Sequence, residues 1–180
     1  RYGSSGSERI YDSLAAWNTA RTSAATAYVP ETCEIGMAFD ELRTSTLYIT
    51  VNSAGTIITT LVNGVRSGAY HNGALMAGYV LWSSGSNAVL GASAYRVRFD
   101  GFTVRNTVAS GNGLDVSKTY AVADRMIALG IGAGATAGAG IYIGAATATA
   151  ANCIVSGFYY GIQTQANLYT ATVANCTAVK

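Results

Sequence analysis

The chain of 180 residues is long enough for one domain with a small N-terminal appendage, and its 50% of hydrophobic residues can fill a sizeable core. Charged residues make up only 11%, well below the roughly 25% of an average soluble domain. The net charge of +2, with no run of Lys or Arg, argues against nucleic acid as a partner. No apolar stretch reaches the roughly 18 residues of a membrane-spanning helix.

The N-terminal region carries the one clear helix signal of the sequence. Asp12 or Ser13 can act as the N-cap. Three residues follow at helical spacing: Leu14, Trp17 and Arg21. The pattern predicts a helix over about residues 13–24, with an apolar side that needs a cover. We therefore assign residues 1–46 to an N-terminal lead-in and capping segment with one helix.

The sequence becomes strand-like from residue 47. Two β-branched runs, 47–51 and 56–62, are separated by an Asn-Ser-Ala-Gly turn. Residues 63–78 form a Gly- and Asn-rich excursion that holds His71, the only histidine, which we interpret as a loop residue without a catalytic role. Two further short strands are predicted, at 79–82 and 88–90.

An internal repeat begins at about residue 95. Four segments place an Asp or Asn in matching surroundings, 24, 28 and 23 residues apart: VRFDGFTV (97–104), AVADRMIA (121–128), TAANCIVS (149–156) and TVANCTAV (172–179). A second marker, Gly followed by an aliphatic residue, opens a short strand after each of the first three: Gly113-Leu114, Gly140-Ile141 and Gly161-Ile162. Constant strands with variable links are typical of stacked coils.

This repeat predicts an all-β fold, a right-handed parallel β-helix (solenoid) over residues 47–180 that is clearest from 95, with a short N-terminal capping helix. Coils stacked about 4.8 Å apart pair each strand with its copies above and below. Asp and Asn tolerate sharp bends, and stacked copies can bond one another. We expect one such ladder: Asp100, Asp124, Asn152 and Asn175. A β-sandwich is the competing fold, but it does not explain two markers that recur together.

The segments VRFDGFTV and ANCIVSGFYYGI (151–162) resemble the pectate-lyase-like right-handed parallel β-helix superfamily, in particular its phage tailspike and surface-protein members. The opening IYDSLAAW (10–17) looks like the segment that precedes the first coil in many secreted or phage-borne β-helix proteins. The resemblance covers residues 95–180 best. It is informative about fold and much less so about function.

Acidic residues near the first repeats are the candidates for catalysis. Asp100 and Asp124 fall on adjacent coils, and Asp115 lies between them. The resemblance implies two uses for such a cluster, Ca²⁺ binding as in lyases and acid–base chemistry as in glycosidases. The alternative is that both aspartates are ladder members, since Asn replaces them further along. The residues favour the ladder, so we predict no metal or other cofactor apart from this Ca²⁺ possibility.

Candidate carbohydrate contacts are Tyr159 and Tyr160 beside a turn, and Arg98 in the first clear coil. Exposed tyrosines can stack on sugar rings, although they can equally pack against the solenoid wall. The resemblance implies a groove arginine that abstracts a proton in lyases, but no local motif selects one here.

The cysteines Cys153 and Cys176 occupy the same place in successive repeats, whereas Cys33 lies far from both. Stacked Cα atoms fall within the distance range of a disulfide, but parallel Cα–Cβ vectors do not favour its torsion. We therefore predict a buried thiol ladder in preference to a disulfide. No neighbouring ligands complete a metal site.

The last repeat, from Asn175 to Lys180, has no polar cap after it. An uncovered coil presents apolar side chains and unpaired strands. We therefore expect other protein chains or further coils to cover this end.

These features favour a structural or adhesive surface protein over an enzyme. We expect a phage or virion tail, fibre or decoration component, or an extracellular fibre subunit, located on a virion surface or outside a cell. Surface glycans are a candidate partner, and nucleic acid is not expected as one. The alternative is a polysaccharide lyase or glycoside hydrolase that acts on acidic polysaccharide, and it rests on the resemblance alone.

Overall fold

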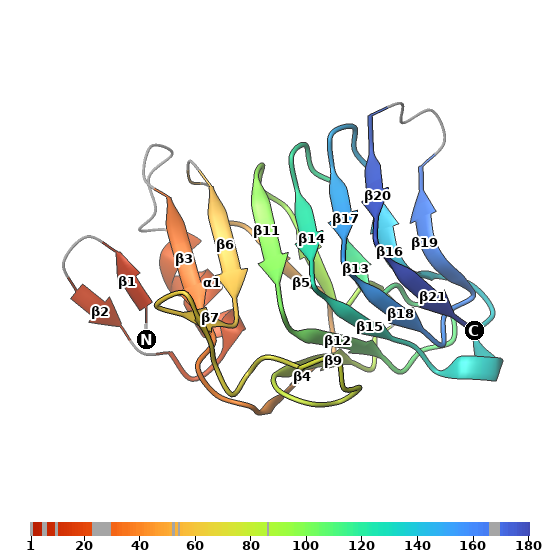
Figure 1. Ribbon diagram of the computed structural model, residues 1–180, viewed down its shortest axis with the longest axis horizontal. Coiled ribbons are helices and arrows are strands. Elements are labelled where there is room, and N and C mark those ends of the chain that lie inside the picture. The colour runs from red at the N-terminus through yellow and green to blue at the C-terminus, as the bar shows by residue number, and fades with distance from the viewer. Residues whose placement is uncertain are drawn as a thin grey trace.

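The computed structural model describes residues 2–4, 7–9, 11–22, 30–51, 53, 55–85, 87–165 and 170–180. Its body is a parallel β-helix whose strands form three sheets along one axis (Figure 1). Sheet 1 has the order β19-β16-β13-β10-β5, sheet 2 the order β20-β17-β14-β11-β6-β3, and sheet 3 the order β21-β18-β15-β12-β9-β4. Every pairing within these three sheets is parallel, as the predicted coil stack requires.

Each coil contributes one strand to each sheet, in the order sheet 1, sheet 2, sheet 3. Coil 1 consists of β5 (Leu47–Ile49), β6 (Thr56–Thr59) and β9 (Val80–Ser83). Coil 2 consists of β10 (Leu90–Ala92), β11 (Val97–Asp100) and β12 (Thr103–Asn106). Coil 3 consists of β13 (Leu114–Asp115), β14 (Val122–Asp124) and β15 (Ile127–Leu129). Coil 4 consists of β16 (Ala139–Ile143), β17 (Thr149–Ala151) and β18 (Ile154–Ser156), and coil 5 of β19 (Tyr160–Thr164), β20 (Thr172–Ala174) and β21 (Thr177–Val179).

Sheets 2 and 3 begin before residue 47, with β3 (Glu31–Glu34) and β4 (Asp40–Arg43). The expected start at residue 47 therefore marks the first coil that has all three strands. The remaining elements lie outside the three sheets: the antiparallel pair β1 (Tyr2–Ser4) and β2 (Ser7–Arg9), helix α1 (Leu14–Thr22), the hairpin β7 (Leu61–Val62) and β8 (Val65–Arg66), and the 3₁₀ turn η1 (Gly132–Gly134).

The core consists of columns of inward side chains at equal coil positions. In sheet 1 one column is Leu47, Leu90, Leu114, Ile141 and Ile162. In sheet 2 it is Cys33, Ile58, Phe99, Ala123, Ala150 and Val173. Leu114, Ile141 and Ile162 are the aliphatic members of the predicted Gly–aliphatic marker, so the register confirms that marker.

Helix α1 covers the N-terminal end of this core (Figure 1). The helix predicted over residues 13–24 is confirmed as Leu14–Thr22, and its expected last residues, 23 and 24, lie outside the described residues. Ser13 is its N-cap, since the Ser13 Oγ accepts the N–H of Ala16 at 3.0 Å. Leu14 and Trp17 are buried in the same cluster as the inward side chains of the first coils. The Asn18 side-chain amide donates to the Tyr48 carbonyl of β5, and its carbonyl oxygen accepts the Thr50 N–H. The helix thus supplies hydrogen-bond partners to backbone groups at the edge of sheet 1.

Glu41 explains why the helix begins where it does. This residue pairs with Leu81 and so occupies an inward position of sheet 3 that later coils fill with aliphatic residues. Its buried carboxylate accepts the N–H groups of Leu14 at 2.9 Å and Ala15 at 3.3 Å, and the Tyr79 hydroxyl at 2.6 Å. Negative charge at a helix N-terminus stabilises the unpaired N–H groups there.

Candidate functional site

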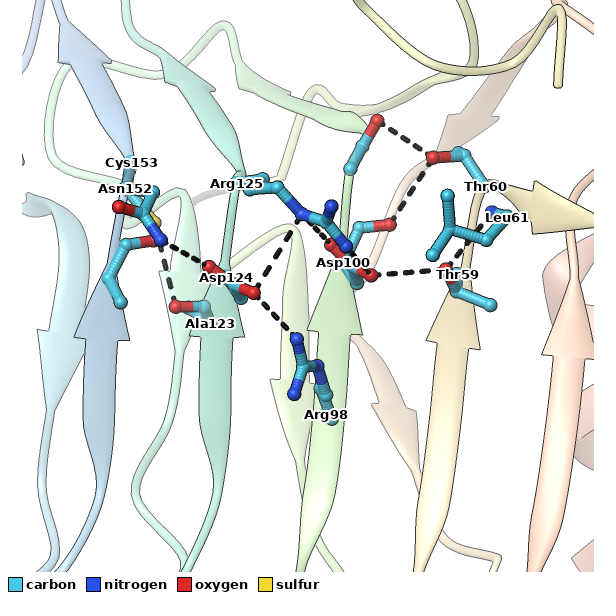
Figure 2. Close-up of polar contacts among 12 residues, drawn as sticks. Thr59, Thr60, Leu61, Arg98, Asp100, Ala123, Asp124, Arg125, Asn152 and Cys153 are labelled. Carbon is cyan, nitrogen blue, oxygen red and sulfur yellow. Dashed lines mark hydrogen bonds and ion pairs between the residues drawn. The ribbon is translucent and has the colours of Figure 1, made fainter. Parts of the chain in front are cut away.

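The candidate site is the corner between sheets 2 and 3, where polar side chains of successive coils follow one another along the axis; Figure 2 shows those of coils 1 to 4. In coils 2 to 5 the chain turns from one sheet to the next through a single residue with positive φ: Gly101 (86°), Arg125 (51°), Asn152 (55°) and Asn175 (51°). Glycine and asparagine adopt this conformation readily. We call this line of residues the corner.

The register corrects the predicted ladder of Asp100, Asp124, Asn152 and Asn175. Asp100 pairs with Asp124, but Asp124 pairs with Ala151 and not with Asn152. The aspartates are the last residues of their strands, whereas the asparagines are the turn residues that follow, equivalent to Arg125. The four residues therefore belong to two neighbouring columns, because Asp and Asn suit both positions.

Side-chain hydrogen bonds nevertheless connect these two columns along the corner. The Asn152 amide donates to the Asp124 carboxylate at 2.9 Å, and the Asn175 amide donates to the Asn152 carbonyl oxygen at 3.4 Å. At the other end the Thr59 hydroxyl donates to Asp100 at 3.2 Å. One polar network thus reaches from coil 1 to coil 5, and Figure 2 shows its part from Thr59 to Asn152.

Two arginines neutralise the two aspartates. The Arg125 guanidinium binds both carboxylate oxygens of Asp100, at 2.8 and 2.5 Å, and its Nε also lies 3.7 Å from Asp124. Arg98 donates to Asp124 at 2.6 Å. The hydrogen bond with Asp100 is the main reason that the pKa of Arg125 lies above its ordinary value, and burial opposes it. Two ion pairs, Arg98–Asp124 and Arg125–Asp100, therefore join coil 2 to coil 3 at the corner.

This arrangement leaves the Asp100 carboxylate poorly available to a substrate or a metal ion. A general acid or base needs a carboxyl group that is open to substrate, but the Asp100 side chain is only 4% exposed and is bound bidentately by Arg125. A Ca²⁺ site needs about six to eight oxygen ligands, and the described residues contain no group of three His, Cys, Asp or Glu side chains arranged to hold a metal. Asp115, the third candidate, lies on sheet 1, where Ser117 donates to it, and so does not join the pair.

The carbohydrate candidates are also separated from one another. Tyr159 and Tyr160 are about half exposed and meet edge to face, with ring centroids 4.7 Å apart, at the start of β19 in coil 5. The Lys180 ammonium lies 5.5 Å from the centre of the Tyr159 ring. Arg98 lies on sheet 2 in coil 2, so the structure does not place it with the two tyrosines.

The cysteine prediction has its geometric counterpart at the corner. Ile154 pairs with Thr177, so the preceding residues Cys153 and Cys176 occupy equal positions in coils 4 and 5. Both are free thiols, and the backbone N–H of Cys153 lies 3.4 Å from the Cys176 sulfur. Burial raises the pKa of the Cys153 thiol to about 12. Each thiol donates to a strand carbonyl of its own coil, at 3.1 Å and 3.2 Å.

We expect Cys153 to resist alkylation in the folded protein because its thiolate is scarce and its sulfur is buried. Treatment with iodoacetamide at about pH 8, followed by peptide mass analysis, measures each site separately. Cys176, which is only partly buried, serves as the internal control and is expected to react faster. Equal labelling of the two sites, or recovery of a Cys153–Cys176 disulfide, would contradict the thiol ladder.

Three features of the corner were missed by sequence reasoning. Arg125 was not assigned to the site, although it binds Asp100, and Thr59 comes from a strand 41 residues earlier. His71 also reaches the corner, as described below. A basic residue directly after Asp124 was the available signal for Arg125, whereas no local pattern indicates Thr59 or His71.

Comparison of the chain with protein-family models, with curated proteins and with solved structures finds no match. Among the described residues, no helix has the length and apolar character needed to cross a membrane.

Proposed function

We propose that this chain is a structural solenoid module of a larger assembly, a tail, fibre or decoration component of a virion or an extracellular fibre subunit, and that coil 5 is the surface through which it joins its partner. The resemblance to surface proteins of the pectate-lyase-like superfamily is consistent with this proposal. The observation that carries it is the exposure of inward side chains in coil 5.

The inward columns are buried through coil 4 and then become exposed. Ala150 and Val155 are buried in coil 4, but the next members of their columns, Val173 and Ala178, are exposed, Val173 by 47%. A hollow at this end is lined by Phe158, Tyr159, Gly161, Ala178, Val179 and Lys180. Strands β19, β20 and β21 are each the outermost of their sheets, so one edge of each is open for pairing.

The two ends of the solenoid differ in this respect. Helix α1 closes the N-terminal end by burying Leu14 and Trp17 over the first coils. Strands β3 and β4 are the outermost strands of sheets 2 and 3 at that end, whereas coil 5 combines three outermost strands with exposed inward side chains. Self-association through coil 5 would join two copies in a closed, isologous pair. Strand pairing between chains then supplies the main-chain hydrogen bonds that coil 5 lacks.

Sedimentation analysis tests this proposal directly. We expect the protein to associate in the micromolar range, which corresponds to about −8 kcal/mol, and Val173→Glu to abolish association because it places a charge in the apolar contact. Thr172→Glu, at the exposed outward position next to it, is the matched control and should associate like the wild type. A monomer at every concentration, or equal effects of the two substitutions, would contradict the proposal.

A further inference from the structure

The longest departure from the coil pattern is residues 61–79, inserted between β6 and β9 in coil 1. This segment includes the Gly- and Asn-rich residues 63–78 of the sequence analysis, and we call the whole of it the excursion. The excursion begins with the β7–β8 hairpin and returns at Tyr79, whose N–H bonds the Ala69 carbonyl at 2.8 Å. Residues 72 to 76 are exposed, whereas Tyr70 and His71 are buried. These two residues contact the body of the solenoid, as do Ser67, whose hydroxyl donates to the Ile35 carbonyl at 2.7 Å, and Asn63, whose N–H donates to Glu34 at 3.3 Å.

Tyr70 and His71 lie against the corners of coils 2 and 3. A side-chain carbon at Gly101 would come within 2.9 Å of the Tyr70 ring, so this turn glycine makes room for the aromatic ring. The rings of Tyr70 and His71 are stacked with centroids 4.7 Å apart, and the Arg66 guanidinium lies 4.3 Å from the centre of the Tyr70 ring. The backbone N–H of His71 reaches the Gly101 carbonyl at 3.4 Å.

The hydrogen bonds of the His71 ring define its protonation state. Nε2 lies 2.6 Å from the Arg125 carbonyl oxygen, which can only accept, so Nε2 carries a proton. Nδ1 lies 2.8 Å from the backbone nitrogen of Gly73, which can only donate, so Nδ1 is unprotonated. Both ring nitrogens are therefore satisfied in one neutral tautomer.

The charges around the ring come from three elements. Arg66 lies on the excursion, Asp100 ends β11, and Arg125 with Asp124 forms the next corner. Burial is the largest cause that lowers the pKa of His71 below its ordinary value, and Arg66 and Arg125 act in the same direction. The Arg125 carbonyl and Asp100 oppose them. Asp100 is itself held by Arg125, so it is poorly placed to accept a proton from the imidazolium.

We propose that the excursion is an acid-sensitive clasp: neutral His71 fastens coil 1 to the corner of coil 3, and protonation of its Nδ1 releases the excursion. A proton on Nδ1 would face the Gly73 N–H, donor against donor, and would add a buried positive charge between Arg66 and Arg125. The clasp thus opens because the bond that shapes the loop is lost while the charge is not compensated.

The direction of the pH dependence follows from linkage. The pKa of His71 is lower in the closed clasp than the value of about 6.5 for a free imidazole. The open state therefore binds more protons, and the stabilisation is complete above pH 6.5 and declines as the pH falls below it. The opening equilibrium rises by up to about tenfold for each unit by which the pKa is lowered.

Two measurements on the intact chain test the clasp. Because His71 is the only histidine, a proton NMR titration reports its pKa without assignment, and we expect a value below 6.5. Hydrogen exchange of peptides that cover residues 67–79, corrected for intrinsic rates, should show lower protection at about pH 5 than at about pH 7.5. Peptides from β14 to β18 should keep their protection.

His71→Phe is the matched variant, because it keeps the stacking on Tyr70 and removes both ring hydrogen bonds. We expect low protection of the excursion at both pH values in this variant, with no pH dependence. A wild-type imidazole pKa at or above 6.5, or protection of residues 67–79 that does not change with pH, would overturn the clasp. Both of these readouts use the wild-type protein, so they decide the question even if the variant folds poorly.

Discussion

Replacing Trp17 with alanine is expected to lower the free energy of unfolding by about 3–5 kcal/mol, the usual range for a buried aromatic residue. The indole is 1% exposed and lies in the core cluster with Leu14, Cys33 and Ile35. Its removal leaves a cavity between α1 and the first strands, which cannot collapse because parallel coils fix their spacing. Urea unfolding followed by circular dichroism measures the loss.

Trp82→Ala is the matched control, since it deletes the same side chain from the partly exposed outer face of sheet 3. We expect a loss of about 1 kcal/mol, typical of a substitution outside the core. Equal losses in the two variants would show that α1 does not close the core. A large effect confined to Trp17→Ala would show that the N-terminal end of the solenoid depends on this one contact.

The parts of the fold that the sequence predicts are those governed by packing. An inward aliphatic side chain is needed in every coil, so the Gly–aliphatic marker at Leu114, Ile141 and Ile162 has a constant register. The helix is predicted for a similar reason, because Leu14 and Trp17 recur on its buried side. Burial constrains both patterns tightly, and a shift by one residue would expose the core.

The corner was harder to predict because two adjacent positions favour the same residue types. Asp100 ends a strand and binds the next turn, whereas Asn152 is itself a turn residue with positive φ. Spacing alone does not separate these positions, and the predicted ladder was one residue out of register. His71 shows a different reason, since its partner Arg125 lies 54 residues away and only folding reveals the contact.

Replacing Asp100 with asparagine is expected to cost about 2–3 kcal/mol. Breaking a fully buried ion pair costs about 3–5 kcal/mol, and the loss is smaller here because the Arg125 side chain is 28% exposed and can be rehydrated. The amide keeps one acceptor but presents its NH₂ group to Arg125 or Thr59 in place of the second (Figure 2). Thermal and urea unfolding measure the change.

Asp115→Asn, on the outward face of sheet 1, is the control and should change stability by about 0.5 kcal/mol or less.

The same two variants separate the structural role of Asp100 from a catalytic one. If the ion pairs at the corner serve only to join adjacent coils, the wild type releases no product from pectin, alginate or host-type glycans, and Asp100→Asn alters stability only. Turnover that disappears in Asp100→Asn while stability is unchanged would instead make Asp100 a catalytic residue. The ion pair with Arg125 leads us to expect the first result, because a buried carboxylate that is bound on both oxygens stabilises the turn that it bridges and is poorly accessible to a substrate.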